Sequence, residues 1–216
     1  MGFVTVGIRI GDRRTPTALA VVEGDWRDEP GATPTPRVES GKIVGMTPAR
    51  QIDYALVRRL ERLPAGTTYP AITARLGVVM EGLRARGTPP TSIYADATGI
   101  GLPIIDGLSQ AARRPVTAVY MTAGDKRVVA DDRRSVTLGK AYVVARLKVL
   151  LEGGRLLLPR TREAEELADD LAAYDVTPVR VDDQAAPFAV GAHDDDITAL
   201  GLAVQEPPMR QSIVWS

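Results

Sequence analysis

The chain has 216 residues, with 27 Lys and Arg against 27 Asp and Glu, so its formal net charge is zero. It contains no cysteine, which excludes a disulfide framework, thiolate metal ligands and a cysteine nucleophile. The length suits one globular domain with a sizeable core, and a hydrophobic share of 44% argues against wholesale disorder. Because the charges balance, a nucleic-acid partner would have to be held by a locally basic face.

The first part of the chain predicts strands. Phe3 to Ile10 is rich in β-branched residues and ends at Gly11-Asp12, and Ala18 to Glu23 is a second apolar run close enough to pair with it. Gly, Pro, Thr and charged residues fill the segment from Asp25 to Pro36, which is typical of a surface excursion. Gln51 to Arg59 favours a third strand.

After these strands the hydrophobic period becomes helical. Apolar residues recur at helical spacing from Tyr69 to Arg86, and Gly87 with Pro89-Pro90 ends the run. Helices and strands then alternate, with Ser92 to Ala95 as a strand and about Leu102 to Ala112 as a helix. The later predicted elements are a strand over Val116 to Tyr120, a polar loop over Thr122 to Arg134, a helix over Leu138 to Leu151, a strand over Arg155 to Leu158, a helix over Ala164 to Tyr174 and a last helix that ends at Val204.

This order of elements predicts an α/β domain. Three consecutive strands followed by alternating units favour a mixed sheet, antiparallel at one side and parallel elsewhere, flanked by helices. The ribonuclease H-like fold has this element order, although other α/β folds share much of it. We expect one domain over residues 1–206 and a C-terminal tail over residues 207–216.

The first candidate for chemistry is Asp96, which follows a short apolar strand and begins the run Asp96-Ala97-Thr98-Gly99-Ile100-Gly101. In an open α/β sheet, ligands gather at the carboxyl ends of the strands. The two glycines allow the backbone to turn sharply into the next helix. In the alternative interpretation the Asp96 carboxylate only caps that turn.

The second candidate is the run His193-Asp194-Asp195-Asp196, which opens an otherwise apolar helix. One carboxylate at a helix start gains from the helix dipole and from capping free N–H groups. Three adjacent carboxylates repel one another, however, and a divalent cation such as Mg²⁺ would relieve that repulsion. Zinc would normally recruit cysteine or more histidine than this chain contains. For His193 itself a structural hydrogen-bonding role is favoured.

Several familiar motifs do not occur in the sequence. It has no phosphate-binding Gly-x-x-x-x-Gly-Lys-Ser/Thr loop, no dinucleotide fingerprint and no Gly-x-Ser-x-Gly nucleophile turn. Basic residues do cluster in one stretch, where a solvated face is the plainer interpretation and contacts to phosphates are the functional one. They are Lys126, Arg127, Arg133, Arg134, Lys140, Arg146 and Lys148.

Together these segments resemble the nuclease domain of the large terminase subunit of tailed bacteriophages. The resemblance extends roughly from Val4 to Val204, and its matching residues are Val6-Gly7-Ile8, Pro16 to Glu23, Tyr94 to Pro103, Gly139-Lys140, His193-Asp194-Asp195 and Ala199 to Ala203. It implies a ribonuclease H-like fold with two divalent cations, Mg²⁺ or Mn²⁺. The implied activity is endonucleolytic cutting of concatemeric viral DNA during genome packaging.

The resemblance also implies roles for residues and partners. Asp96 would be the central metal ligand, Asp194 and Asp195 would complete the site, and His193 and Asp196 would be secondary. The backbone of double-stranded DNA would be positioned by Lys140, Arg133, Arg134, Lys126 and Arg127. Members of the family follow an ATPase motor domain, and their expected partners are that domain, a portal and a small terminase subunit, in the host cytoplasm at the procapsid portal.

Three further expectations concern the extent and the location of the chain. Since it lacks a phosphate-binding loop, it corresponds to the nuclease part of such a polypeptide alone. No stretch approaches the roughly 18 apolar residues of a transmembrane helix, so no membrane association is expected. The N-terminus has neither the basic region nor the cleavage site of a signal peptide.

One position departs from the family pattern, because Arg9 stands where the family has an Asp in the first strand. A guanidinium cannot ligate a cation and would compete with one for the remaining carboxylates. Three interpretations remain open: a deliberate inactivating substitution, a naturally weakened enzyme, or a shifted register in which Asp12 is the ligand. Arg9 also makes a non-catalytic DNA-binding or motor-docking module an alternative, beside another ribonuclease H-like nuclease of the resolvase or transposase kind.

These assignments predict a specific geometry. Asp96, Asp194 and Asp195 should converge around one cation-sized space, with their carboxylates within roughly 10 Å of one another. Arg9 should lie within salt-bridge reach of Asp96 or of the two helix carboxylates. Asp196 should point away or cap the helix.

Overall fold

An eight-stranded mixed sheet forms the centre of the computed structural model, which describes residues 3–99, 101–173, 180–181, 184–185 and 194–207. The strand order is β10-β5-β2-β1-β6-β7-β9-β8. Its antiparallel half consists of β1 (Phe3–Arg9), β2 (Thr17–Asp28) and β5 (Gln51–Leu63). Its parallel half continues from β1 through β6 (Ser92–Asp96), β7 (Thr117–Thr122) and β9 (Ser135–Gly139).

Short strands complete the two edges. They are β8 (Arg127–Val129), antiparallel to β9, and β10 (Leu156–Leu157), parallel to β5. A separate small pair is formed by β11 (Arg180–Val181) and β12 (Gln184–Ala185). The mixed sheet confirms the fold class predicted from the sequence.

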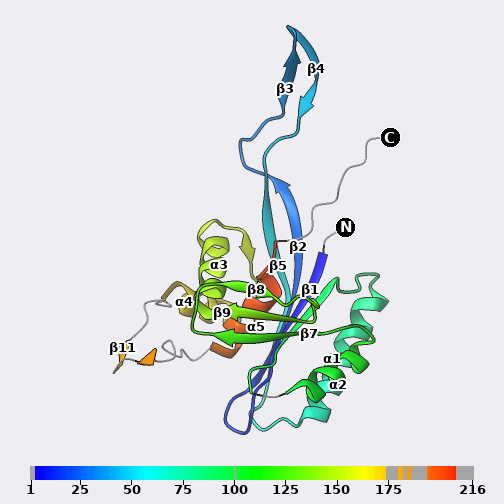
Figure 1. Cartoon of the computed structure of the whole chain (residues 1–216), viewed down its shortest axis with the longest axis vertical. Coiled ribbons are helices and arrows are strands. Elements are labelled where there is room, and N and C mark those ends of the chain that lie inside the picture. The colour runs from blue at the N-terminus through cyan, green and yellow to red at the C-terminus, as the bar shows by residue number, and fades with distance from the viewer. Residues whose placement is uncertain (1–2, 100, 174–179, 182–183, 186–193, 208–216) are drawn as a thin grey trace.

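Helices cover both faces of the sheet and enclose a hydrophobic core on each (Figure 1). One face carries α1 (Tyr69–Ala85) and α2 (Leu102–Ala112), which pack on β1, β6 and β7. The other face carries α3 (Lys140–Glu152), α4 (Arg162–Ala173) and α5 (Asp194–Val204). None of the helices within these described ranges is long and apolar enough to cross a membrane.

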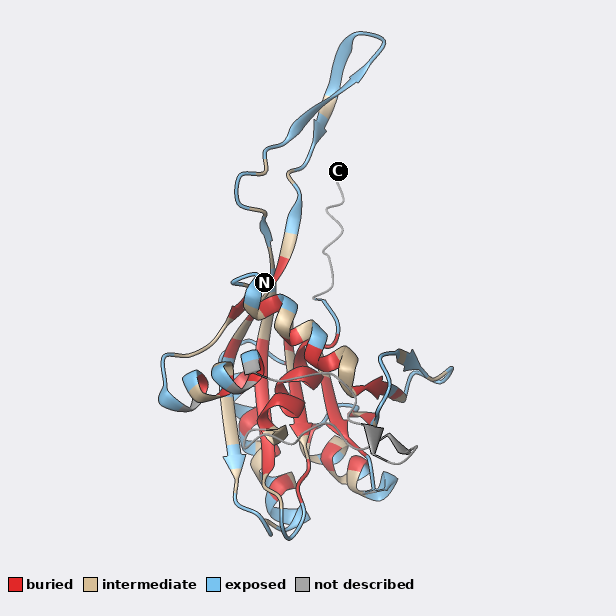
Figure 2. Ribbon diagram, turned by 90° about the vertical axis from the view of Figure 1, so that its left-hand side faces the viewer, coloured by how far each residue is buried: buried red, intermediate tan, exposed pale blue. Residues whose placement is uncertain are grey.

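A two-stranded ribbon projects from the body, where the sequence predicted only a surface excursion (Figure 2). The strand β2 continues to Asp28, and β3 (Thr35–Glu39) pairs with β4 (Lys42–Thr47) beyond it. Side chains along this ribbon are exposed, including Ile43 at 70%. Because little of it is buried, the ribbon lacks the strong apolar alternation by which a strand is recognised in a sequence.

The region after β7 also differs from the prediction. The expected loop over Thr122 to Arg134 contains β8, and the expected helix from Leu138 begins only at Lys140 because β9 precedes it. The apolar residues of β9 run directly into those of α3, so periodicity alone does not mark the boundary between strand and helix.

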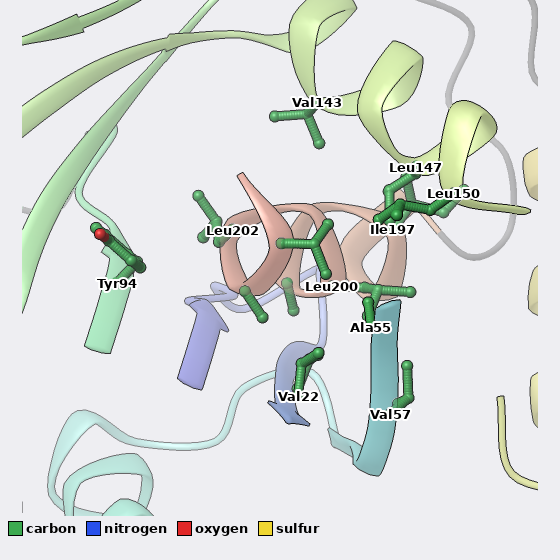
Figure 3. Packing of buried hydrophobic residues seen from close by; sticks show 14 of the residues in the cluster. Val22, Ala55, Val57, Tyr94, Val143, Leu147, Leu150, Ile197, Leu200 and Leu202 are labelled. Carbon is green, nitrogen blue, oxygen red and sulfur yellow. The ribbon is translucent and has the colours of Figure 1, made fainter. Parts of the chain in front are cut away.

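From Asp196 to Val204 the helix α5 is buried, between the sheet and α3 (Figure 3). Two glycines permit this approach. A Cβ atom on Gly7 of β1 would overlap the carbonyl oxygen of Ala199, and one on Gly201 would overlap the Val143 side chain of α3. The first turn of α5, which carries the three consecutive aspartates, is therefore held over the sheet.

Candidate active site

Strand pairing places Arg9 and Asp96 side by side at the carboxyl ends of β1 and β6. Ile8 of β1 pairs with Ala95 of β6, so the next residue of each strand is the last one. The Asp96 side chain is only 6% exposed. It lies on the face covered by α5, since Tyr94, two residues earlier, packs in the core under that helix.

The two oxygens of Asp96 have different partners. Oδ1 accepts a hydrogen bond of 2.9 Å from the backbone N–H of Thr98. This bond caps the turn, as the alternative interpretation of Asp96 predicted. The Thr98 hydroxyl in turn accepts a hydrogen bond of 2.9 Å from the N–H of Met121, which ties this turn to β7. Oδ2 faces Arg9. The carboxylate is therefore fixed by its turn and still presents one oxygen to the site.

Arg9 lies between two carboxylates from distant parts of the chain. Its Nε is 3.5 Å from Oδ2 of Asp96 and 3.6 Å from Oδ1 of Asp195, and its Nη1 donates to the carbonyl oxygen of Ile10. Since both carboxylate oxygens lie within 3.6 Å of one nitrogen, they can be no more than about 7 Å apart. The predicted salt-bridge contact of Arg9 is confirmed.

The three aspartates of the first turn of α5 contact three different cations. Asp195 faces Arg9, and Asp194 Oδ1 lies 2.6 Å from Nζ of Lys140 at the start of α3. Asp196 is buried and pairs with Arg62 of β5, away from Arg9, as predicted. Sequence reasoning missed Arg62, because only the sheet register places it opposite Ala18, which is itself the partner of Arg9.

The environment of Asp195 disfavours its charged form. Burial raises the pKa of this carboxyl above its ordinary value, and the nearby carboxylate of Asp194 adds to the effect. The Arg9 guanidinium acts in the opposite direction and lowers the pKa. A positive charge at this position is therefore favourable.

Asp12 holds a turn beside the site. Its Oδ1 accepts hydrogen bonds of 2.7 Å from the N–H of Arg14 and 2.9 Å from the N–H of Thr15. These bonds lower the pKa of the exposed Asp12 carboxyl. Its role as an alternative metal ligand stays a prediction. His193 lies outside the described residues.

The basic residues predicted to bind DNA divide into two groups. Lys140 and Arg127 have partners inside the fold: Lys140 pairs with Asp194, whereas Arg127 donates to Gln205 Oε1 at 3.1 Å and pairs with Glu206. The other group is exposed at the β8–β9 edge of the sheet and comprises Lys126, Arg133 and Arg134.

The carboxylates offer the hard oxygen donors that Mg²⁺ and Mn²⁺ prefer. Within the described part of the chain, however, no three Asp, Glu or His side chains are grouped closely enough to hold one ion. The expected convergence is found for Asp96 and Asp195 around a guanidinium, whereas Asp194 pairs with Lys140. The donor set thus suits a divalent cation, and Arg9 and Lys140 would compete with that cation for it.

No protein-family model and no curated protein matches the sequence. Among solved structures, the fold resembles that of the large terminase nuclease from thermophilic phage G20c. The identity is 18% and the TM-score 0.56, over 95% of this chain and 83% of that chain. A manganese-soaked human cytomegalovirus terminase nuclease domain is also similar, with 11% identity and a TM-score of 0.51 over 94% of this chain and 82% of that chain. The chain therefore has the ribonuclease H-like fold found in viral terminase nucleases.

Proposed function

We propose that this chain is the nuclease domain of a terminase large subunit, which cuts concatemeric viral DNA during genome packaging. One observation carries the proposal. Asp96 and Asp195, about a hundred residues apart in the sequence, meet at the carboxyl ends of the central strands. They do so in a fold shared with two terminase nuclease domains.

Divalent cations, Mg²⁺ or Mn²⁺, are part of the proposal. When bound, two such ions would activate the attacking water and stabilise the leaving 3′ oxygen of the phosphodiester. Asp96 and Asp195 would hold them, with Asp194 completing the set. The fixed turn at Thr98 and the buried α5 keep these carboxylates in place. Arg9 would have to leave its position between Asp96 and Asp195 as the cations enter, so we expect weak metal binding.

The proposed substrate is double-stranded DNA, contacted through its phosphates, since a packaging cut needs little sequence preference. The proposed partners are an ATPase motor domain of the same terminase, the portal and the small terminase subunit. The place of action would be the host cytoplasm, at the procapsid portal. These assignments rest on the fold that the chain shares with terminase nucleases.

A plasmid-nicking assay with Mn²⁺ or Mg²⁺ tests the proposal. We expect slow, metal-dependent nicking that Asp96→Asn and Asp195→Asn each abolish. Asp25→Asn is the matched control, because Asp25 is an exposed aspartate that pairs with Arg27 at the base of the projecting ribbon. Nicking that survives Asp96→Asn would come from a contaminant or another site, and the proposal would fail.

A second candidate is a non-catalytic DNA-binding or motor-docking module. It is favoured by the pairing of the three acidic residues of the candidate site with Arg9 and Lys140. DNA binding without any nicking, in the chain as it stands and after Arg9→Asp, would select this function over the nuclease.

A further inference from the structure

A groove of about 800 Å³ lies between α2 and the strands β7 and β9. Four arginines from two separate segments line it, Arg113 and Arg114 at the end of α2 and Arg133 and Arg134 before β9. Among the residues that the structure describes, two acidic ones share the lining, Asp106 and Asp132. The groove is therefore locally basic in a chain whose formal net charge is zero.

The arginines of this groove differ from most other described arginines because no acidic side chain in the described ranges forms an ion pair with them. Arg113, Arg133 and Arg134 are exposed and form no ion pair with any residue in the described ranges. The carboxylate of Asp132 accepts a hydrogen bond of 2.9 Å from the backbone N–H of Arg134, which defines the turn. Arg114 donates to the carbonyl oxygen of Thr91 at 2.9 Å. Three guanidinium groups are thus available to an external anion.

Two of these arginines occupy an unusual backbone conformation. Arg113 has a φ of 49° and Arg133 a φ of 55°, and among the described non-glycine residues only Ser40 also has a positive φ. The left-handed region costs a residue with a side chain roughly 1 kcal/mol or more, a cost that glycine avoids. Arg113 is the left-handed C-cap of α2 and Arg133 lies in the turn before β9, so two independent turns each place an arginine at the same groove.

The groove opens on the face of the sheet opposite the acid cluster, which consists of Asp96 and the three aspartates that begin α5, Asp194, Asp195 and Asp196. Ala118 of β7 lines it and packs in the core under α1 and α2. Its neighbour Val119, which pairs with Asp96, packs in the core under α5. Asp96 lies on that second face, so the sheet separates the groove from the acid cluster.

We infer that this arginine groove binds the phosphate backbone of double-stranded DNA at a position separate from the acid cluster. The inference rests on the proposed function, which makes DNA the substrate. Guanidinium groups match the geometry of phosphate oxygens and form paired hydrogen bonds with them. Arg133 and Arg134 were already predicted from the sequence to contact DNA. Arg113 and Arg114 were not singled out there and join them in this groove. Lys140 and Arg127 serve contacts within the fold instead.

The test measures the affinity of the whole chain for a labelled DNA duplex at several salt concentrations, with a chelator present so that no cutting occurs. The variant combines Arg113→Ala, Arg133→Ala and Arg134→Ala. We expect the slope of log affinity against log salt to fall by about 2–3, because each lost phosphate contact removes about 0.9. Affinity at about 0.1 M salt should fall roughly tenfold or more.

Two further variants control for charge and folding. The first combines Arg27→Ala, Arg37→Ala and Arg50→Ala, which removes the same charge from arginines paired with acids in or near the projecting ribbon, and should leave the slope unchanged. The second replaces the three groove arginines by lysine, which keeps the charge and should retain most of the slope. An unchanged thermal midpoint shows that the variants fold.

The outcomes separate the two proposals. If the chain as it stands binds duplex DNA and the groove variant has the same affinity and slope, the groove inference is overturned and the proposed function survives. If the chain binds no duplex DNA at any salt concentration, the proposed function itself fails. Tighter binding of single-stranded RNA than of the duplex, lost in the groove variant, would overturn the assignment of the groove to DNA.

Discussion

At the scale of single residues, the acid cluster is neutralised by the side chains of the chain itself. Asp96 and Asp195 share Arg9, Asp194 pairs with Lys140, and Asp196 pairs with Arg62. Without these cations, four carboxylates at the ends of β6 and α5 would repel one another in a partly desolvated site. Arg9 thus supplies part of the charge that a divalent cation would bring.

Replacing Arg9 by Asp should separate two effects of Arg9: it neutralises nearby carboxylates, and it occupies the position of a possible metal ligand. In metal-free buffer we expect Arg9→Asp to lower the free energy of unfolding by about 1–3 kcal/mol, because a cation is replaced by another anion. With Mn²⁺ present, plasmid nicking should increase by about tenfold or more, since an added carboxylate would complete the proposed ligand set. Denaturant titration with a chelator and nicking with Mn²⁺ measure the two effects.

Arg9→Gln is the matched control, because it removes the positive charge without adding a ligand. It should lower stability in the absence of metal and gain little nicking. The expectation for Arg9→Asp is contradicted if the chain as it stands nicks robustly and Asp12→Ala abolishes that activity. In that case the missing ligand would be Asp12.

Tyr94 gives a second residue-scale prediction, on alkaline stability. Burial, reinforced by Glu206, which accepts a hydrogen bond of 2.9 Å from the phenol, raises the pKa of Tyr94 from 10.0 to about 12. As pH rises from about 10 to about 12, the unfolded chain therefore releases this proton first, and the stability that Tyr94 contributes below pH 10 is lost. Urea unfolding across this range should show a shallower decline for Tyr94→Phe. An identical decline in both proteins would contradict the assignment.

At the scale of elements, helices and strands with a periodic row of buried apolar residues were predictable from the sequence. Strands that form mainly through pairing with a neighbouring strand were not. The bounds of α2 match the prediction, and those of α1 and β6 do so to within one residue. In α1 the buried residues Ile72, Leu76, Val79, Met80 and Leu83 recur at the helical period. The strands β3 and β8 have mostly exposed side chains and exist through pairing with β4 and β9, which local periodicity does not record.

The same distinction applies to the candidate site. Asp96, Asp194 and Asp195 were recognisable because a carboxylate after a buried strand and an acidic run before an apolar helix are local patterns. Their cationic partners were not all recognisable, since Arg62 lies 134 residues before Asp196 and meets it only after the sheet forms. For the arginine groove, the two contributing segments are brought together by β7 and β9.

The close packing of α5 against α3 leads to an element-scale prediction. Gly201→Ala adds a methyl group where the Val143 side chain of α3 already lies, so α5 or α3 must shift. We expect a loss of about 1–3 kcal/mol in the free energy of unfolding, as for other overpacked cores. Nicking should fall as well, because α5 carries Asp194 and Asp195.

Gly82→Ala is the control for this prediction. In the helix α1, a Cβ atom on Gly82 would meet nothing within 4 Å, so alanine should be neutral or slightly stabilising there. Equal stability of the Gly201→Ala and Gly82→Ala proteins would show that α5 is not tightly seated.

At the scale of the whole molecule, a second charged cluster joins the antiparallel strands to the helical second half. Asp53 of β5 is buried and pairs with Arg146 of α3 and with Nη1 of Arg155, the latter at 2.6 Å. Arg146 also donates to the carbonyl oxygen of Val204 at the end of α5, at 3.2 Å. The Asp53 carboxylate therefore joins β5 to Arg146 and Arg155, and Arg146 extends the cluster to the end of α5.

Asp53→Asn tests whether this cluster holds the two halves together. The substitution keeps the shape of the side chain but leaves the guanidinium groups of Arg146 and Arg155, which are 19% and 16% exposed, without their counter-charge. Removing one partner of a buried ion pair is costly, and we expect a loss of about 2–4 kcal/mol in the free energy of unfolding. Asp25→Asn removes the same charge from an aspartate that is 51% exposed and should change stability by less than about 0.5 kcal/mol.

If the Asp53→Asn protein unfolds at the same urea concentration as Asp25→Asn, the hydrophobic cores on the two faces of the sheet hold the halves together without this cluster. A lower midpoint with a broader transition would instead show that the cluster couples α3 and β10 to the antiparallel strands, because its loss would let the two parts unfold separately.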